Sequence, residues 1–137
     1  MNKKIAAAWI LAAASAAGWA LLAAQAFGGF RFDGPLSRVI TPNGDGINDI
    51  AVICFDNPSD SDVAGKVYTL WGAQVADLLP RQSATATSCP AGNSRVPGKT
   101  QHMDWDPRSQ GQRRGGVYVY RVQAEGMTFV GTLMVVK

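Results

Sequence analysis

Two apolar runs decide the fold class of this chain: VYVYRVQA at residues 117–124 and TFVGTLMVV at residues 128–136, joined through Glu125-Gly126. Because side chains alternate along an extended strand, one face of the first run carries four core candidates, Tyr118, Tyr120, Val122 and Ala124. A buried tyrosine needs a partner for its hydroxyl, so we expect one of the two to bond to loop backbone. The short link between two such runs predicts a β-hairpin.

Shorter runs of the same kind precede this hairpin, at residues 36–40, 50–55, 66–71, 74–78 and 101–105. They are separated by turn residues, such as Asn57-Pro58-Ser59-Asp60 and Gly72-Ala73. A long Ser-, Ala- and Pro-rich connection fills residues 80–99. The pattern predicts an all-β sandwich or barrel of about seven strands over residues 36–137.

Length and charge exclude several classes of function. The 137 residues allow one small domain and no multidomain enzyme. Of the 13 basic side chains, Lys3 and Lys4 lie in the leader, which leaves 11 against 10 acidic ones in the rest of the chain. No basic stripe with interleaved aromatic residues is present, so we expect no nucleic-acid binding.

Residues 1–26 form a basic and then apolar leader, IAAAWILAAASAAGWALLAAQA after Lys4. Two interpretations stay open. The small residues of Ala24-Gln25-Ala26 fit a signal peptide cleaved before Phe27. The length of the run also fits one uncleaved helix in the inner membrane. Both interpretations put the N-terminus in the cytoplasm and the folded part outside it, in the periplasm or at the cell surface. Residues 27–35, Gly-rich and aromatic, read as a linker.

The chain has two cysteines, Cys54 and Cys89. In an oxidising compartment an even pair predicts a disulfide. Closing the loop of about 36 residues between them would stabilise the fold by about 4 kcal/mol on the chain-entropy model. Two unpaired thiols are the alternative.

The stretch TPNGDGIND at residues 41–49 gathers side-chain oxygens between two glycines. Hard cations take six to eight oxygens, so a weak calcium site is one hypothesis, with the predicted ligand set Asn43, Asp45, Ile47, Asn48 and Asp49. The other is an Asx-rich turn whose side chains bond to their own backbone.

Three motifs in order resemble one domain family: TPNGDGIND, then LWGAQV at residues 70–75, then Trp105-Asp106 followed by GVYVYR at residues 116–121. They are similar to the immunoglobulin-like domain of the flagellar hook-capping protein and to related gliding-motility and type IX secretion C-terminal domains. The resemblance covers about residues 40–136. It implies an Ig-like antiparallel β-sandwich, behind one N-terminal hydrophobic helix, with a non-catalytic role in attachment, assembly or sorting.

The chain departs from that family in three places. Pro107 follows Trp105-Asp106 where a glycine is usual, the connection at residues 80–99 is long, and we expect the domain to stand alone behind its leader. We therefore expect a structural or assembly subunit, held at the membrane and packing against protein partners in a larger membrane or cell-surface complex. A cleaved, secreted module for adhesion, ligand binding or filament formation is the alternative.

The chain does not read as an enzyme. His102 is its one histidine, and no G-x-S-x-G motif accompanies it. Asp104 and Asp106 flank Trp105 and could form a carboxylate pair, but turn and capping roles are the simpler expectation.

Overall fold

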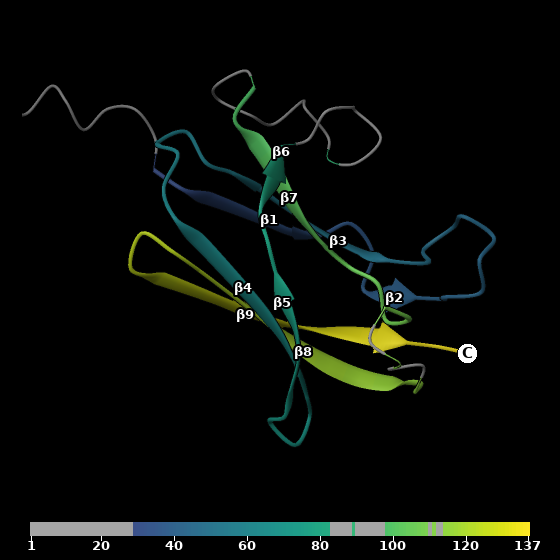
Figure 1. Cartoon of the computed structure of the whole chain (residues 1–137). Helices are drawn as coiled ribbons and strands as arrows, with labels where there is room; N and C mark the ends of the chain where they lie inside the picture. Colours follow the sequence, from purple (N-terminus) through teal and green to yellow (C-terminus); the bar gives the residue numbers. More distant parts are fainter. Residues whose placement is uncertain (1–28, 83–88, 90–97, 110, 112–113) are drawn as a thin grey trace, which may run out of the picture.

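The computed structural model describes residues 29–82, 89, 98–109, 111 and 114–137, in which every regular element is a β-strand. These strands form two sheets (Figure 1). The four-stranded sheet contains, in order, β1 (Arg31–Pro35), β3 (Ala51–Asp56), β7 (Thr100–Trp105) and β6 (Arg81–Gln82). The five-stranded sheet contains β2 (Val39–Ile40), β9 (Met127–Val135), β8 (Gly116–Ala124), β4 (Val63–Thr69) and β5 (Gln74–Leu78). The all-β prediction is confirmed, with nine strands in the described residues where about seven were expected.

The chain changes sheets between its first two strands. β1 pairs with β3 in an antiparallel manner, whereas β2 pairs with β9 in parallel; the other strand pairs in the described residues are antiparallel. Part of the expected linker, Arg31–Pro35, is therefore a strand. The sequence does not predict this strand, because Gly34 and Pro35 are residues typical of turns. Gly34, at φ 93°, takes up a register shift in the β1–β3 ladder. The strand expected at residues 36–40 shrinks to β2.

A single apolar core lies between the two sheets. Phe55, Ile53 and Met103 fill it from the four-stranded sheet, and Val67, Val122 and Leu133 fill it from the other, each at 0% exposure. Along β8 the burial alternates as predicted, with the same four side chains inward: Tyr118, Tyr120, Val122 and Ala124. The Tyr118 hydroxyl donates to the carbonyl of Arg114 at 2.9 Å, so the expected bond to loop backbone is present.

Left-handed residues close the two tight hairpins. Glu125 and Gly126, at φ 48° and 75°, link β8 to β9 with the two positive values that a type I′ turn requires. Between β4 and β5, the Gly72 N–H donates to the Thr69 carbonyl at 3.0 Å. This bond ends β4 at Thr69, so Leu70 and Trp71 belong to the turn and not, as predicted, to the strand.

The predicted disulfide joins Cys54 on β3 to Cys89, with 5.8 Å between their Cα atoms. Both residues are 2% exposed. The connection expected over residues 80–99 begins with β6, which pairs with β7. Apart from Cys89, its residues 83–97 lie outside the described part of the chain.

The leader, residues 1–26, and the helix expected within it also lie outside the described residues. Within the described ranges, none of the chain forms a helix that is long and apolar enough to cross a membrane.

Candidate functional site

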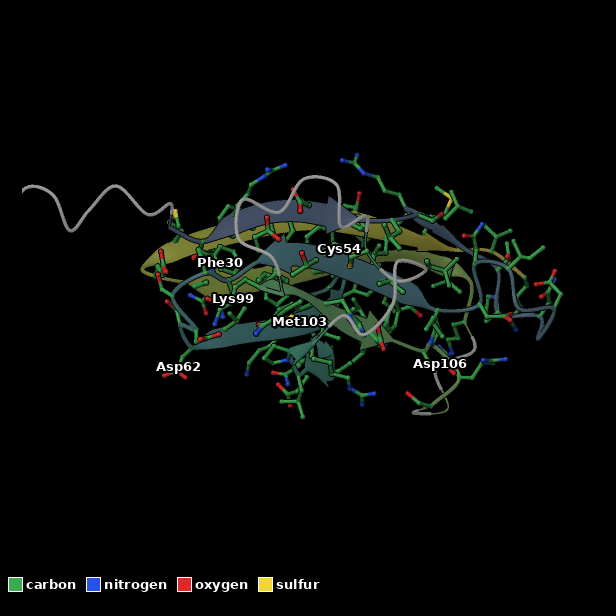
Figure 2. The ribbon with its side chains drawn as sticks, turned by 90° about the horizontal axis from the view of Figure 1, so that it is seen from above. Phe30, Cys54, Asp62, Lys99, Met103 and Asp106 are labelled. Carbon is green, nitrogen blue, oxygen red and sulfur yellow. A yellow bond between two sulfur atoms is a disulfide. The ribbon has the colours of Figure 1, made fainter. Side chains whose placement is uncertain are left out.

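The sandwich has two distinct ends, and the described chain enters at one of them. The Phe30 N–H donates to the Glu125 carboxylate at 3.0 Å, beside the β8–β9 turn. We call this the leader end; it comprises Phe30, residues 57–61, Lys99 and Glu125. At the opposite, distal end lie residues 41–50, residues 70–73 and the described residues of 106–116. Figure 2 shows Phe30, Asp62 and Lys99 toward one end and Asp106 toward the other.

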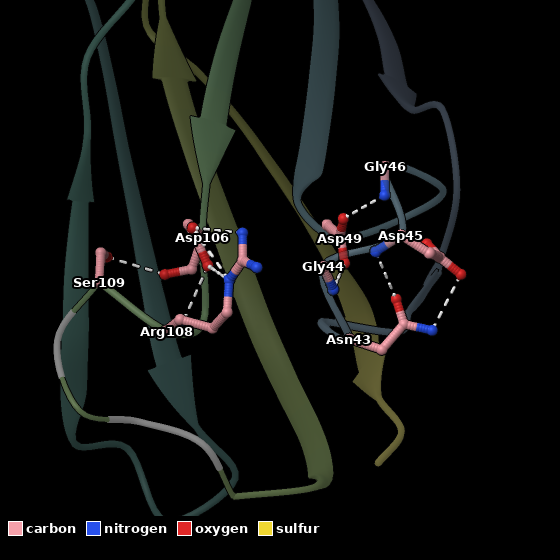
Figure 3. A network of polar contacts seen from close by, with 8 residues as sticks. All are labelled: Asn43, Gly44, Asp45, Gly46, Asp49, Asp106, Arg108 and Ser109. Carbon is pink, nitrogen blue, oxygen red and sulfur yellow. Dashed lines mark hydrogen bonds and ion pairs between the residues drawn. The ribbon is translucent and has the colours of Figure 1, made fainter.

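The loop at residues 41–49 is held by bonds from its own side chains (Figure 3). Asp49 accepts the N–H of Gly44 on one oxygen and that of Gly46 on the other, both at 2.7 Å. Asp45 accepts the Ile47 N–H at 2.8 Å and the Asn43 amide at 2.9 Å, while Asn43 accepts the Asp45 N–H at 3.0 Å. Each of these bonds spans two to five residues, so the loop is a set of interlocked Asx turns.

A second polar pair packs against this loop. Arg108 binds Asp106 through two nitrogens, with Nε–Oδ1 and Nη2–Oδ2 distances of 3.0 Å each. The guanidinium lies beside Gly44, where a Cβ would be 3.8 Å from Nη1. The side-chain bond from Arg108 lowers the pKa of Asp106. The Gly44 N–H, foremost, with the Gly46 N–H and the positive charge of Arg108, lowers the pKa of Asp49.

The predicted calcium ligands thus lie together, and the side-chain oxygens of Asn43, Asp45 and Asp49 already accept hydrogen bonds. Besides the carboxylates, the carbonyls of Ile47 and Asn48 accept the hydroxyl and N–H of Thr41, at 3.2 Å and 2.7 Å. Among the residues that the structure describes, no three His, Cys, Asp or Glu side chains are grouped to hold a metal. The geometry is that of the Asx-turn alternative, and calcium binding at this loop stays a hypothesis.

An exposed apolar hairpin tip is the other feature of the distal end. Trp71 is 94% exposed and Leu70 62%. A hollow of about 500 Å³ lies beside them, lined also by Thr69, Arg114 and Tyr118. Because Gly72 at φ 85° turns the chain, the two side chains stand outside the core that their sequence neighbours fill. Together they form an exposed apolar patch at this end of the domain.

His102 lies on β7, between β3 and β6. His102 Nε2 is 3.5 Å from Asp104 Oδ2, and its cross-strand partners are Cys54, which is in the disulfide, and Arg81. Its Nδ1 is buried without a hydrogen bond to any described group. None of these partners is a free nucleophile. Asp104 and Asp106 serve His102 and Arg108 separately and do not form a carboxylate pair.

Sequence reasoning missed three residues of the two ends. Arg108 was passed over, although Asp106-x-Arg108 after a strand is a spacing that lets one side chain reach the other in a turn. Glu125 was assigned to a turn only, yet it also accepts the Ser61 hydroxyl at 2.7 Å and so ties the β8–β9 turn to residues 57–61. The exposure of Trp71 could have been inferred from its place next to Gly72.

Comparisons with known proteins add no relative: a scan of protein-family models gives no match to this chain, and a search of curated proteins gives no significant one.

Proposed function

We propose that this chain is a non-catalytic structural subunit: an Ig-like domain on the outer side of the membrane that is held there by its N-terminal leader and docks on a larger assembly. The observation that carries the proposal is the hairpin tip. Trp71, 94% exposed, stands at the end of the sandwich away from the point where the leader joins it. A domain tethered at one end and apolar at the other is suited to bridge a membrane and a partner.

The strand order supports an Ig-like assignment. In immunoglobulin domains one sheet has the order A-B-E-D, and the other contains G, F and C with C′ added in the variable type. The orders β1-β3-β7-β6 and β9-β8-β4-β5 correspond to these, and β2, the additional strand at the β9 edge of the second sheet, stands outside the comparison. The Tyr118 bond to Arg114, four residues upstream on the strand equivalent to F, matches the tyrosine corner of such domains. The disulfide differs, because it joins the strand equivalent to B to a connection and not to F.

The disulfide also supports a location outside the cytosol. Buried disulfides persist in oxidising compartments such as the periplasm and the cell surface. The leader, with Lys3 and Lys4 before its apolar run, favours the same side for the folded part. A folded part outside the cytosol that is anchored at the membrane would meet proteins of a membrane or cell-surface complex. We therefore propose such proteins as its partners.

The partner contact is tested by two matched serine variants. Leu70 and Leu79 are 62% and 71% exposed, and Leu79 follows β5 on the side of the leader end. Cross-linked membranes of the wild type should yield a partner complex that Leu70→Ser and Trp71→Ala weaken by about tenfold, while Leu79→Ser leaves it unchanged. Loss of the complex in all three variants, or in none, would contradict a docking role for the tip.

The cleaved, secreted module is the second candidate, favoured by the small residues of Ala24-Gln25-Ala26. Intact mass of the chain from cells separates the two. A mature chain that starts at Phe27 removes the anchor, and one that retains residues 1–26 removes the secreted form.

A further inference from the structure

Strand β9 is paired along the whole of one edge and along little of the other. β8 covers it from Met127 to Val135, whereas β2 reaches only Met134 and Val135. Figure 1 shows β2 beside the far end of β9 alone. In the part of the chain that the structure describes, residues 127–133 have no strand on that second edge.

The backbone groups on this open edge can be identified. The Met134 N–H donates to Arg38 and the Val136 N–H to Ile40, at 2.7 Å and 2.8 Å, both away from β8. Because successive residues of a strand alternate, the N–H and C=O groups of Thr128, Val130 and Thr132 face the same way. The two-residue turn between β8 and β9 gives the same assignment. It pairs Ala124 with Met127, so the backbone groups of Met127 and of the other odd-numbered residues face β8.

Nothing in this segment discourages pairing with another strand. Residues 127–133 read MTFVGTL, with neither charge nor proline, whereas natural edges are usually protected by lysine, proline or a bulge. The edge strand β1 has such protection: Pro35, a register shift before Gly34 and the Arg31–Asp33 ion pair at 3.1 Å.

We propose that a second copy of this chain pairs with β9 in an antiparallel manner, about a two-fold axis at Val130. Thr128 of each copy then lies opposite Thr132 of the other, and Val130 lies opposite Val130. All three are residues whose N–H and C=O groups face the edge, so each pair exchanges both hydrogen bonds. The window is bounded by β2 at Met134 and by the turn at Gly126, and residue 130 is its centre.

The side chains fit this symmetric register. Val130 is 62% exposed, and its contact with its own copy would bury apolar surface, while the threonine pairs are favourable cross-strand neighbours. The nearest charge on the same face, Arg121, is the β8 partner of Val130. Across the two-fold axis it is three strand spacings, or about 14 Å, from its own copy, beyond one Debye length at physiological salt. The exposed Val130, the threonine pairs and the separation of the two arginines therefore all fit a second copy of this chain.

Introducing a charge at residue 130 tests the proposed register, in which Val130 of one copy lies opposite Val130 of the other. We expect the full chain, purified from the fraction of the cell that contains it, to form a concentration-dependent dimer in sedimentation velocity. Val130→Lys and Val130→Glu each place like charges opposite one another and should weaken the dimer by about tenfold or more. An equimolar mixture of the two variants should restore it, because opposite charges then meet.

Leu79→Lys is the matched control, since Leu79 is 71% exposed, comparable to Val130 at 62%, but follows β5 at the opposite edge of the same sheet. It should leave the dimer unchanged. A wild type that stays monomeric at every concentration, a dimer that survives both charged variants, or one lost in Leu79→Lys would each overturn the proposal. Circular dichroism of the variants checks that they fold. The result is independent of whether the leader is cleaved or the hairpin tip binds a partner.

Discussion

The ring of Tyr120 occupies the space that a side chain at Gly131 would need. The two residues are cross-strand partners on β8 and β9, and a Cβ on Gly131 would lie 2.2 Å from the Tyr120 hydroxyl oxygen and 2.4 Å from Cζ. The tyrosine thus covers the backbone that the glycine leaves bare.

Gly131→Ala should therefore destabilise the domain by about 1–3 kcal/mol, because the buried ring of Tyr120 has to move. Urea unfolding followed by circular dichroism measures the loss. Gly126→Ala is a useful contrast: a Cβ there meets nothing within 4 Å, and its cost comes from φ alone. The double variant Tyr120→Leu with Gly131→Ala should lose less than the sum of the two single variants.

Removing the disulfide should cost about 2–5 kcal/mol, since Cys54–Cys89 closes a long loop across a small domain. Cys54→Ala with Cys89→Ala, and the wild type under reductant, should both melt at lower temperature. The two routes control for each other, because the alanine variant also loses sulfur packing. An unchanged melting temperature, with both thiols free by titration, would contradict a stabilising role.

Calcium at the 41–49 loop predicts a melting temperature that rises when millimolar calcium replaces chelator, the range expected of a weak site. Asp49→Ala should abolish that rise. It should also lower the melting temperature in chelator, because the Gly44 and Gly46 N–H groups lose their acceptor. Equal wild-type melting temperatures in calcium and in chelator would leave the Asx turns as the whole role of the loop.

Glu125 predicts a loss of stability in acid. The Ser61 hydroxyl, foremost, and the Phe30 N–H lower its pKa below the ordinary 4.5. A depressed pKa contributes stability above the unfolded value, and this is lost as the pH falls through the folded one. The melting temperature of Glu125→Gln should therefore fall less than that of the wild type below about pH 4.5. Asp62→Asn, directly before β4, is the control; parallel curves for Glu125→Gln and the wild type would contradict the proposed role of the Glu125 carboxylate.

The fold was largely predictable because alternation is a strong signal where one face of a strand is buried. The β8–β9 hairpin followed from the alternating tyrosines and the Glu125-Gly126 turn. The disulfide followed from the even number of cysteines and the oxidising compartment that the leader predicts. β1 was not predicted because Gly34 and Pro35 resemble a turn, and because its pairing depends on β3, which comes after the loop at 41–49. The loop at 41–49 was predicted as a cluster of oxygens, but its bonds depend on backbone angles that the letters do not specify.

The transfer of β1 to one sheet and β2 to the other has a mechanical consequence. β1 starts at the leader end and runs toward the distal end along β3, so a pull between residue 29 and the Trp71 tip loads the β1–β3 ladder along its length. The hydrogen bonds between β1 and β3 must then break together. A strand pulled away at a right angle to its axis would instead lose them one by one. The first strand is thus arranged to resist tension.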